Sequence, residues 1–230
     1  MLKKIWIYTQ KYEFIGVMIS FIFNIISWNR KKIKGKNNIV HYERTFLKKT
    51  SIIIIGNNNV VSIKKNAVLI NTGILIVGNN HKIEIGEQCI IKNSGFCFED
   101  NGCKILIDDK TTAEGIQVAA LELDTSIIIG SDCMFSANIS IRNSDSHSII
   151  DVVTHERINY AKDIVIGNHV WVAEDVKILK GASIGNNSII GMGSIVTQKI
   201  SNNSIAVGTP ARVIKGNVDW KRERMYKTNL

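Results

Sequence analysis

A repeat of six residues runs through the C-terminal half of this 230-residue chain and constrains its fold more than any other feature. A β-branched aliphatic residue recurs at every sixth position, and the residue after each one is mostly small. These aliphatic positions are Ile166, Val172, Ile178, Ile184, Ile190 and Val196. In an α-helix this period would spread the side chains over all faces, whereas a three-sided coil with six residues per side points them all inward. The repeat therefore predicts a parallel β-solenoid with coils of about eighteen residues.

The six-residue spacing of apolar residues continues upstream, although it is less regular there. It is visible at Ile129, Phe135 and Ile141, and again at Val77, Ile83 and Cys89. We therefore expect a mainly β chain with a solenoid domain over residues 51–216 and a C-terminal tail over residues 217–230. The rhythm breaks at about residues 142–165, which are polar and charged and predict a loop that leaves the solenoid.

The first fifty residues differ in character, and we expect a separate basic and apolar helical segment there. The apolar stretch Phe14–Trp28 is short for a membrane span, and a basic run follows it at Arg30, Lys31, Lys32, Lys34 and Lys36. No signal peptide is expected, because the basic cluster follows the apolar run. A polar seam lies on one helical face at Gly16, Ser20, Asn24 and Ser27. Either the broad apolar face packs on the solenoid or a neighbouring subunit, or residues 1–36 lie on an anionic membrane surface.

Charge and cysteine content exclude some functions. Residues 1–50 carry eleven Lys or Arg and two Glu, whereas the rest of the chain carries eighteen basic and eighteen acidic residues. Because the excess charge of +9 is confined to the N-terminal fifth, the basic pI gives no argument for nucleic-acid binding. The four cysteines form no CxxC pair and have no histidine at metal-site spacing, so we expect reduced thiols, no metal and a cytoplasmic location.

His147 is the candidate general base among five histidines, because it opens the interrupted segment within the string Asn143–Ser148. Neutral imidazole can accept the proton of a hydroxyl near neutral pH while the oxygen attacks a thioester. Asp145 or a nearby carbonyl would orient the ring. His155 and His169 are the competitors, although His169 falls in the turn of a regular repeat, which favours a structural role.

Three strings resemble the hexapeptide-repeat acetyltransferases of the left-handed β-helix class. They are Ile166–Ala173 (IGNHVWVA), Ile190–Val196 (IGMGSIV) and Ala206–Gly216 (AVGTPARVIKG). Together with the Asp-Ser-His-Ser segment, they resemble the bacterial branch that O-acetylates capsule, O-antigen or polysialic acid sugars. The resemblance is strong over residues 129–216. Before residue 129 the chain resembles the family only in having repeats.

This resemblance implies a homotrimer with the active site between neighbouring solenoids, acetyl-CoA as the donor and a saccharide as the acceptor. It implies that His147 is the base and that Trp171 lines the active site. It also implies that the pantetheine arm contacts backbone groups near Ala173, Gly191, Gly193 and Ser194. The nucleotide end would meet the segment that contains Thr209, Pro210, Ala211, Arg212 and Lys215. Small residues permit close approach to the backbone, and a fixed cation suits a phosphate. The sequence departs from the common pattern at His155 and Ala173, where glycine is usual.

Other functions compete with O-acetylation. A γ-type carbonic anhydrase shares the solenoid but needs two metal-binding histidines five residues apart, and no two histidines here have that spacing. A non-catalytic scaffold would leave His147 and the terminal Gly208–Arg212 string without a role. N-acetylation of an amino sugar needs the same donor and base, and the short apolar N-terminus argues against the extra nucleotide-binding domain that such enzymes often carry. We therefore expect an O-acetyltransferase at the cytoplasmic side of the membrane.

Overall fold

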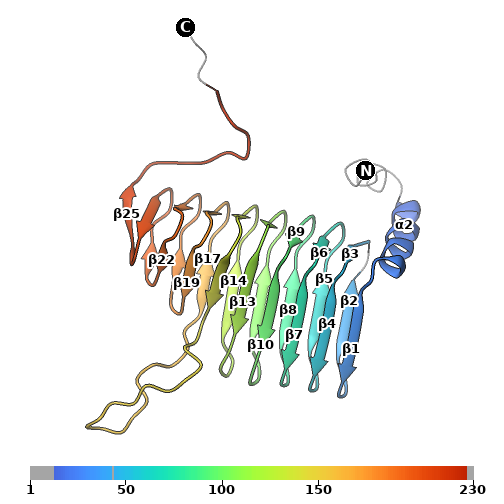
Figure 1. Ribbon diagram of the computed structural model, residues 1–230, viewed down its shortest axis with the longest axis horizontal. Helices are drawn as coiled ribbons and strands as arrows, with labels where there is room; N and C mark the ends of the chain where they lie inside the picture. The colour runs from blue at the N-terminus through green and yellow to red at the C-terminus, as the bar shows by residue number, and fades with distance from the viewer. Residues whose placement is uncertain (1–12, 43, 227–230) are drawn as a thin grey trace.

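In the computed structural model, which describes residues 13–42 and 44–226, the chain winds into a three-sided parallel β-solenoid with one helix at its N-terminal end (Figure 1). Each coil contributes one strand to each of three sheets, named here sheets A, B and C. Sheet A contains β1 (Arg30–Lys34), β4 (Ser51–Ile55), β7 (Gly73–Val77), β10 (Gly95–Phe98), β13 (Ile116–Ala120), β16 (Ile139–Arg142), β19 (Lys177–Leu179) and β22 (Ile195–Val196). Sheet B contains β2 (Ile39–Tyr42), β5 (Val60–Ile63), β8 (Lys82–Ile85), β11 (Lys104–Ile107), β14 (Ser126–Ile129), β17 (Ile164–Ile166), β20 (Ser183–Ile184) and β23 (Lys199–Ile200).

Sheet C completes the prism and ends in a hairpin. It contains β3 (Phe46–Lys48), β6 (Val68–Ile70), β9 (Ile90–Lys92), β12 (Thr112–Ala113), β15 (Met134–Phe135), β18 (Trp171–Val172), β21 (Ile189–Ile190), β24 (Ile205–Gly208) and β25 (Ala211–Lys215). The last pair, β24 and β25, is antiparallel, so the hairpin closes the C-terminal end of the stack.

The predicted inward positions form the core. Ile166, Val172, Ile178, Ile184, Ile190 and Val196 are each at most 2% exposed, which confirms the solenoid prediction. Upstream, the step of six fails at Val77, whose side chain is 40% exposed, because its neighbour Ile76 points inward instead. Ile83 and Cys89 are buried as predicted.

The length of a coil changes along the stack. Near the C-terminus, Ile178 pairs with Val196 and equivalent residues lie 18 apart, as predicted. In the N-terminal half, Ile52 pairs with Ile74 and equivalent residues lie 22 apart, so the prediction of eighteen-residue coils is wrong there.

Longer strands in sheets A and B account for these N-terminal coils, because β4 and β5 contain five and four residues whereas β19 and β20 contain three and two. The turns between sheets A and B join the coils through asparagine side chains. Asn79 donates its backbone N–H to Oδ1 of Asn101 at 2.9 Å, and Asn57 does the same to Asn79, so the side chains form a ladder from coil to coil. Gly56 and Gly78 precede these asparagines with positive φ, and a Cβ atom at Gly56 would lie 1.8 Å from the carbonyl oxygen of Gly78. The turns therefore require glycine for close coil stacking.

The helix α2 (Glu13–Ile26) covers the first coil with its polar seam and with Phe23, whose ring meets Phe46 at 5.6 Å between centroids, while most of its apolar face is exposed. Ser20 and Ser27 are buried, and Asn24 donates to the carbonyl of Thr45 while accepting from the N–H of Leu47. The expectation that the broad apolar face packs on the solenoid is therefore wrong. The open coil end presents unpaired backbone groups, which polar side chains can satisfy.

The solenoid begins before the expected boundary at residue 50. β1, β2 and β3 pair in register with β4, β5 and β6, so residues 30–48 form the first coil. The basic run after the helix is consequently a sheet A strand: Arg30, Lys32 and Lys34 align with Ser51, Ile53 and Ile55. The helical part of the N-terminal segment that the structure describes is α2 alone.

Candidate active site

His147 lies where the chain leaves sheet A after β16 and enters the protruding loop of residues 143–163. Its exposed side chain lines an open cleft of about 500 Å³. The backbone N–H donates to the carbonyl of Asp145 at 2.8 Å, and the carbonyl accepts from Nδ2 of Asn159 at 2.8 Å. Within residues 13–42 and 44–226 the imidazole itself has no hydrogen-bond partner, so both ring nitrogens are available to a ligand.

Asp145 does not orient this ring, contrary to the expectation from the sequence. Its carboxylate forms an ion pair with Lys180 and accepts from Nδ2 of Asn159 at 2.8 Å. The bond from Lys180 and then that from Asn159 hold the pKa of the Asp145 carboxyl below its usual value. Asp145 therefore fixes the base of the loop rather than the histidine tautomer.

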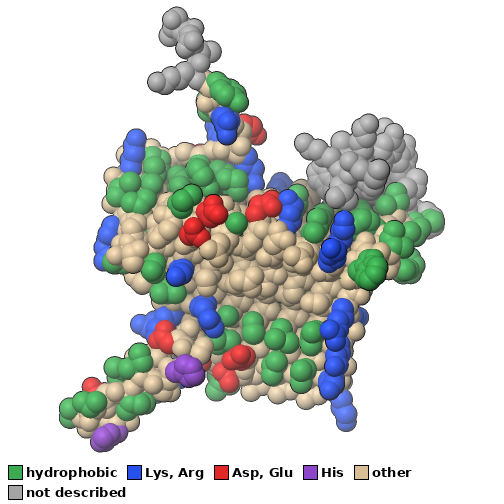
Figure 2. Space-filling model, viewed as in Figure 1, with side chains coloured by type: hydrophobic (Ala, Val, Ile, Leu, Met, Phe, Trp, Pro, Cys, Tyr) green, Lys and Arg blue, Asp and Glu red, His purple; other side chains and the backbone are tan. Residues whose placement is uncertain are grey.

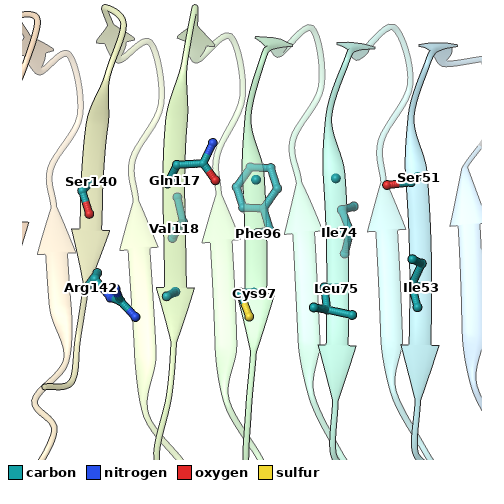
Figure 3. A pocket seen from close by; sticks show the side chains of 13 residues that line it. Ser51, Ile53, Ile74, Leu75, Phe96, Cys97, Gln117, Val118, Ser140 and Arg142 are labelled. Carbon is teal, nitrogen blue, oxygen red and sulfur yellow. The ribbon is translucent and has the colours of Figure 1, made fainter. Parts of the chain in front are cut away.

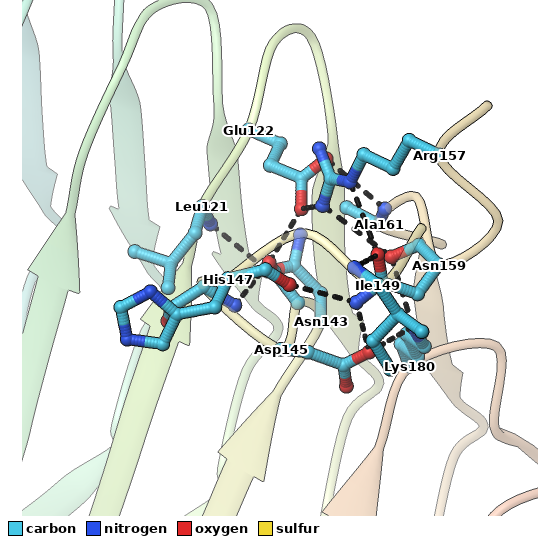
Figure 4. A network of polar contacts seen from close by, with 12 residues as sticks. Leu121, Glu122, Asn143, Asp145, His147, Ile149, Arg157, Asn159, Ala161 and Lys180 are labelled. Atoms are coloured by element: carbon cyan, nitrogen blue, oxygen red, sulfur yellow. Dashed lines mark hydrogen bonds and ion pairs between the residues drawn. The ribbon is translucent and has the colours of Figure 1, made fainter. Parts of the chain in front are cut away.

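A group of polar side chains, named here the loop clamp, ties the two ends of the loop to the solenoid (Figure 4). It consists of Glu122, Ser144, Asp145, Arg157, Asn159 and Lys180. Arg157 makes two hydrogen bonds to the Glu122 carboxylate, at 2.6 and 3.0 Å, and Ser144 donates to the same group at 2.6 Å. Burial alone would raise the pKa of Glu122, but these donors outweigh it and the pKa is lowered. The clamp keeps Glu122 ionised and sets the position of the residues around His147.

Asn159 joins the clamp to the backbone next to His147. It accepts from the N–H of Ile149 at 2.7 Å through Oδ1, and donates through Nδ2 to the His147 carbonyl. His155 lies near the loop tip, where its N–H donates to Asp151, and it does not line the cleft. The clamp was not predicted, because Arg157 and Glu122 are 35 residues apart and the repeat pattern gives no signal for such a pair.

Trp171 projects from the outer face of sheet C and is 37% exposed. The indole of Trp220, from the predicted tail, lies 6.2 Å from it between ring centroids. Trp220 is only 6% exposed, because it stacks on His169 with centroids 4.2 Å apart and donates from Nε1 to the His169 carbonyl. Arg222 holds the same segment through an ion pair in which its Nη2 lies 3.0 Å from Oδ1 of Asp132. The segment 217–222 is therefore packed against the solenoid beside Trp171.

His169 has the structural role that its place in the repeat predicts. Its Nδ1 lies 2.7 Å from the Asp132 carboxylate and its Nε2 lies 3.0 Å from the carbonyl of Trp220. Partial burial would lower the pKa of His169, but the Trp220 carbonyl and Asp132 outweigh it and the pKa is raised above 6.5. The protonated ring is thus the form that holds the C-terminal segment.

We expect the attachment of residues 217–222 to weaken as pH rises. A histidine whose folded pKa is raised contributes fully below its unfolded value near 6.5, and the contribution disappears as pH rises through the folded value. Hydrogen exchange at the amides of Val218 and Trp220 should be slower at pH 6 than at pH 8, after correction for intrinsic rates. The variant His169→Gln should lose this difference. Equal protection of the wild type at both pH values would contradict the assignment.

The candidate donor-binding residues gather at the C-terminal end of the stack. Because Val172 pairs with Ile190 and Ile190 with Ala206, Ala173 and Gly191 lie on successive coils along the edge between sheets C and A. The exposed residues Thr209, Pro210, Arg212 and Lys215 belong to the terminal hairpin. Gly193 is also exposed, and a Cβ atom added there would lie more than 4 Å from every other described residue except its chain neighbours.

At two of these positions the side chain faces inward, so contact with a donor there would be through the backbone, as expected for Ser194. Ser194 is fully buried, and its hydroxyl accepts from the N–H of Gly208 at 3.0 Å. Ala211 is also fully buried. Their side chains therefore support the hairpin rather than present a surface to a ligand.

The three parts of the predicted site lie on different parts of the prism. His147 is at the edge between sheets A and B, Trp171 is on sheet C, and Ala173 with Gly191 marks the edge between sheets C and A. A single chain thus does not bring the base, the tryptophan and the candidate donor track into one cleft.

Comparison with known proteins agrees with this architecture. The bacterial transferase hexapeptide family (six repeats) matches residues 163–198. A polysialic acid O-acetyltransferase of Neisseria meningitidis is 35% identical over 197 residues, which cover 85% of this chain and 91% of that protein. This chain belongs to the hexapeptide-repeat acetyltransferases.

This hexapeptide-repeat acetyltransferase is also similar to two other proteins whose names refer to acetylation of polysialic acid. The crystal structure of the polySia-specific acetyltransferase NeuO superposes with a TM-score of 0.80 at 33% identity and covers 88% of this chain and 92% of that one. A polysialic acid O-acetyltransferase of Escherichia coli O1:K1 is 39% identical over 97 residues. That match covers 42% of this chain and only 32% of the length of the Escherichia coli protein.

Proposed function

We propose that this hexapeptide-repeat acetyltransferase transfers an acetyl group from acetyl-CoA to a hydroxyl of a cell-surface saccharide, of the sialic-acid-containing capsule type. The observation that carries the proposal is the exposed imidazole of His147, held at an open cleft by the loop clamp. The similarity to the Neisseria meningitidis polysialic acid O-acetyltransferase over 85% of this chain supports the acceptor class.

The residues of the cleft suit proton transfer to and from a hydroxyl. The donor thioester supplies the acetyl group when bound. His147 would accept the hydroxyl proton as the new C–O bond forms, and would return it to the sulfur as the C–S bond breaks. Arg142 lines the same cleft, and its positive charge would favour the oxyanion that develops on the acetyl carbonyl.

We infer that the donor lies along the edge between sheets C and A. Gly193 is exposed and an added Cβ atom there would meet no other described residue within 4 Å, so a ligand can approach the backbone at this point of the edge. Arg212 and Lys215 are exposed on the terminal hairpin, where they would meet the phosphates of the nucleotide.

We further propose that the working enzyme is a homotrimer. His147 and Trp171 lie on opposite sides of sheet B within one chain. If sheet B faces a threefold axis, the edge with His147 on one subunit adjoins the Trp171 side of the next. The site would then be completed only between subunits, which closed cyclic symmetry allows.

Mass spectrometry of the saccharide tests the proposed reaction. Purified enzyme with acetyl-CoA should add acetyl groups to capsule polysaccharide, and mild base should remove them, because esters hydrolyse where amides persist. Base-stable acetylation would indicate transfer to an amine instead. Absence of transfer to every saccharide tried would contradict the proposed function.

We propose that α2 attaches the enzyme to the inner face of the plasma membrane. In the part of the chain that the structure describes, no helix is long and apolar enough to cross a membrane. The outer face of α2 nevertheless exposes Met18, Phe21, Ile22 and Ile25, with Phe21 64% and Ile25 66% exposed. A surface helix with such a face inserts its apolar side chains at the lipid boundary.

Replacing Phe21 and Ile25 together with serine is therefore expected to reduce binding to phosphatidylglycerol-containing vesicles by roughly tenfold. Vesicle cosedimentation measures this, and the double variant Lys48→Gln/Lys49→Gln, at the same end of the solenoid, is the control. Unchanged sedimentation of the serine variant would contradict membrane attachment through α2.

A further inference from the structure

The outer face of sheet A forms a groove that crosses the strands along the solenoid axis (Figure 3). Parallel pairing aligns its outward residues from coil to coil, so Ile53, Leu75, Cys97 and Ala119 form one row. A second row alongside contains Ser51, Gly73, Gly95, Gln117 and Ser140. The groove encloses about 390 Å³ and spans β4 to β16.

The groove presents apolar groups in one row and hydrogen-bonding groups in the row beside it. The first row offers aliphatic and thiol surface, while Ser51, Gln117 and Ser140 in the second row offer hydroxyl and amide groups. Gly73 and Gly95 have no side chains, and the Gln117 amide lies over Gly95, where an added Cβ atom would be 2.2 Å from the Gln117 Oε1. A sugar chain presents both C–H faces and hydroxyl groups, and a site for it needs both kinds of surface.

One end of the groove opens into the His147 cleft. Arg142 lines both cavities, because its strand β16 ends where the loop begins. A chain lying in the groove would therefore reach His147 without leaving the protein surface.

The other end of the groove reaches the basic strand β1. Lys32 continues the row of Ile53, and Arg30 continues the row of Ser51. All five residues of β1 are exposed and four of them are Lys or Arg; Figure 2 shows a column of blue side chains at this end of the solenoid. The strands of sheet A contain six Lys or Arg and no Asp or Glu.

The two cationic ends are separated by a length that suits an extended polymer. Five inter-strand steps separate β1 from β16, and at about 4.8 Å per step this is roughly 24 Å. A single sugar cannot contact both ends, whereas a chain of several carboxylated sugars can pair with β1 and with Arg142 at once.

We propose that the sheet A groove, from Arg30 and Lys32 to Arg142, binds an extended anionic saccharide chain whose reacting residue lies at His147. The inference rests on the proposed O-acetyltransferase function and adds to it the surface on which several residues of the acceptor chain are bound at once. It also gives the basic run a role in acceptor binding rather than in membrane attachment.

Steady-state kinetics with polysialic acid of defined length test the groove. The double variant Arg30→Gln/Lys32→Gln should raise KM for long chains by about tenfold, with kcat and the KM for acetyl-CoA unchanged. For acceptors of one or two residues it should change nothing, because these do not reach β1. Lys48→Gln/Lys49→Gln removes the same charge from the last residue of β3 and the residue after it, at the same end of the solenoid, and should behave as wild type.

A second pair of variants probes the middle of the groove. Leu75→Asp should raise KM for long chains more than Leu75→Lys does, because only the aspartate repels the carboxylates. Light scattering should give the same oligomeric mass for all variants, and vesicle binding should match wild type.

Several results would overturn the groove assignment. One is an unchanged KM for long chains in the Arg30→Gln/Lys32→Gln variant. Another is a variant that loses its oligomeric state or its vesicle binding while its KM stays unchanged. If the wild type acetylates only neutral or monomeric saccharides, the groove assignment fails while the O-acetyltransferase proposal stands. If it acetylates no saccharide, both fail.

Discussion

Replacing His147 with alanine is expected to lower kcat for acetyl transfer by about 10²–10⁴-fold, the contribution typical of a positioned general base. The imidazole lies exposed at the cleft and makes no hydrogen bond within the described residues, so its removal breaks no hydrogen bond there. The melting temperature and acetyl-CoA binding should therefore match wild type. Release of the CoA thiol, followed with a thiol reagent at saturating acceptor, measures the change.

His155→Ala is the matched control, because His155 belongs to the same loop but does not line the cleft. We expect this variant to keep wild-type turnover. The assignment of the base fails if purified His147→Ala turns over at a near-normal rate on the acceptor that the wild type uses.

The core of the C-terminal coils could be predicted because each inward position obeys a short, local rule. One β-branched residue per side must fill the prism interior, and Ile166 and Ile184 are two such residues with buried side chains. The N-terminal coils follow the same rule, but their sheet A and sheet B strands are longer, so a fixed step of six moves out of phase at Val77. A search for Gly-x-Asn turns such as Gly56–Asn58 and Gly78–Asn80 could have revealed the longer repeat.

The orientation of α2 was not predictable from its apolar content alone. Burial of an apolar face is normally the dominant stabilising term, yet the open end of the first coil presents backbone groups that need hydrogen-bond partners. Asn24 and Asn29 satisfy these groups at Leu47 and Thr50, which turns the seam inward and leaves Phe21 exposed.

The candidate site was predictable as separate strings but not as an arrangement. His147 follows from its place at the break in the repeat, and Trp171 from the resemblance. The contacts that surround them join residues far apart in the sequence, such as His169 with Trp220 and Glu122 with Arg157. No local pattern encodes such pairs, and their identity depends on which loop residues the fold brings to the same coil.

Asn159→Ala is expected to lower kcat by roughly 10²-fold, although Asn159 is buried and carries no chemistry itself. Its amide bonds the N–H of Ile149, the carbonyl of His147 and the carboxylate of Asp145, so one side chain fixes the backbone on both sides of the base. Loss of these bonds leaves the Ile149 N–H without its partner, which should cost about 1–3 kcal/mol of local stability. Acetyl-transfer kinetics and hydrogen exchange across residues 143–163 measure the two effects.

The division between kcat and KM distinguishes this role from general destabilisation. The proposed donor edge at Ala173 and Gly191 lies away from the clamp. The KM for acetyl-CoA should therefore stay within about twofold of the wild-type value, because the variant loses no contact with the donor. Val153→Ala, at an exposed position near the loop tip, is the control and should leave both constants unchanged. If Asn159→Ala loosens the loop in hydrogen exchange but keeps its turnover, His147 does not need the clamp for catalysis. A parallel loss of turnover and loop protection would instead show that the rate depends on where the loop holds the imidazole.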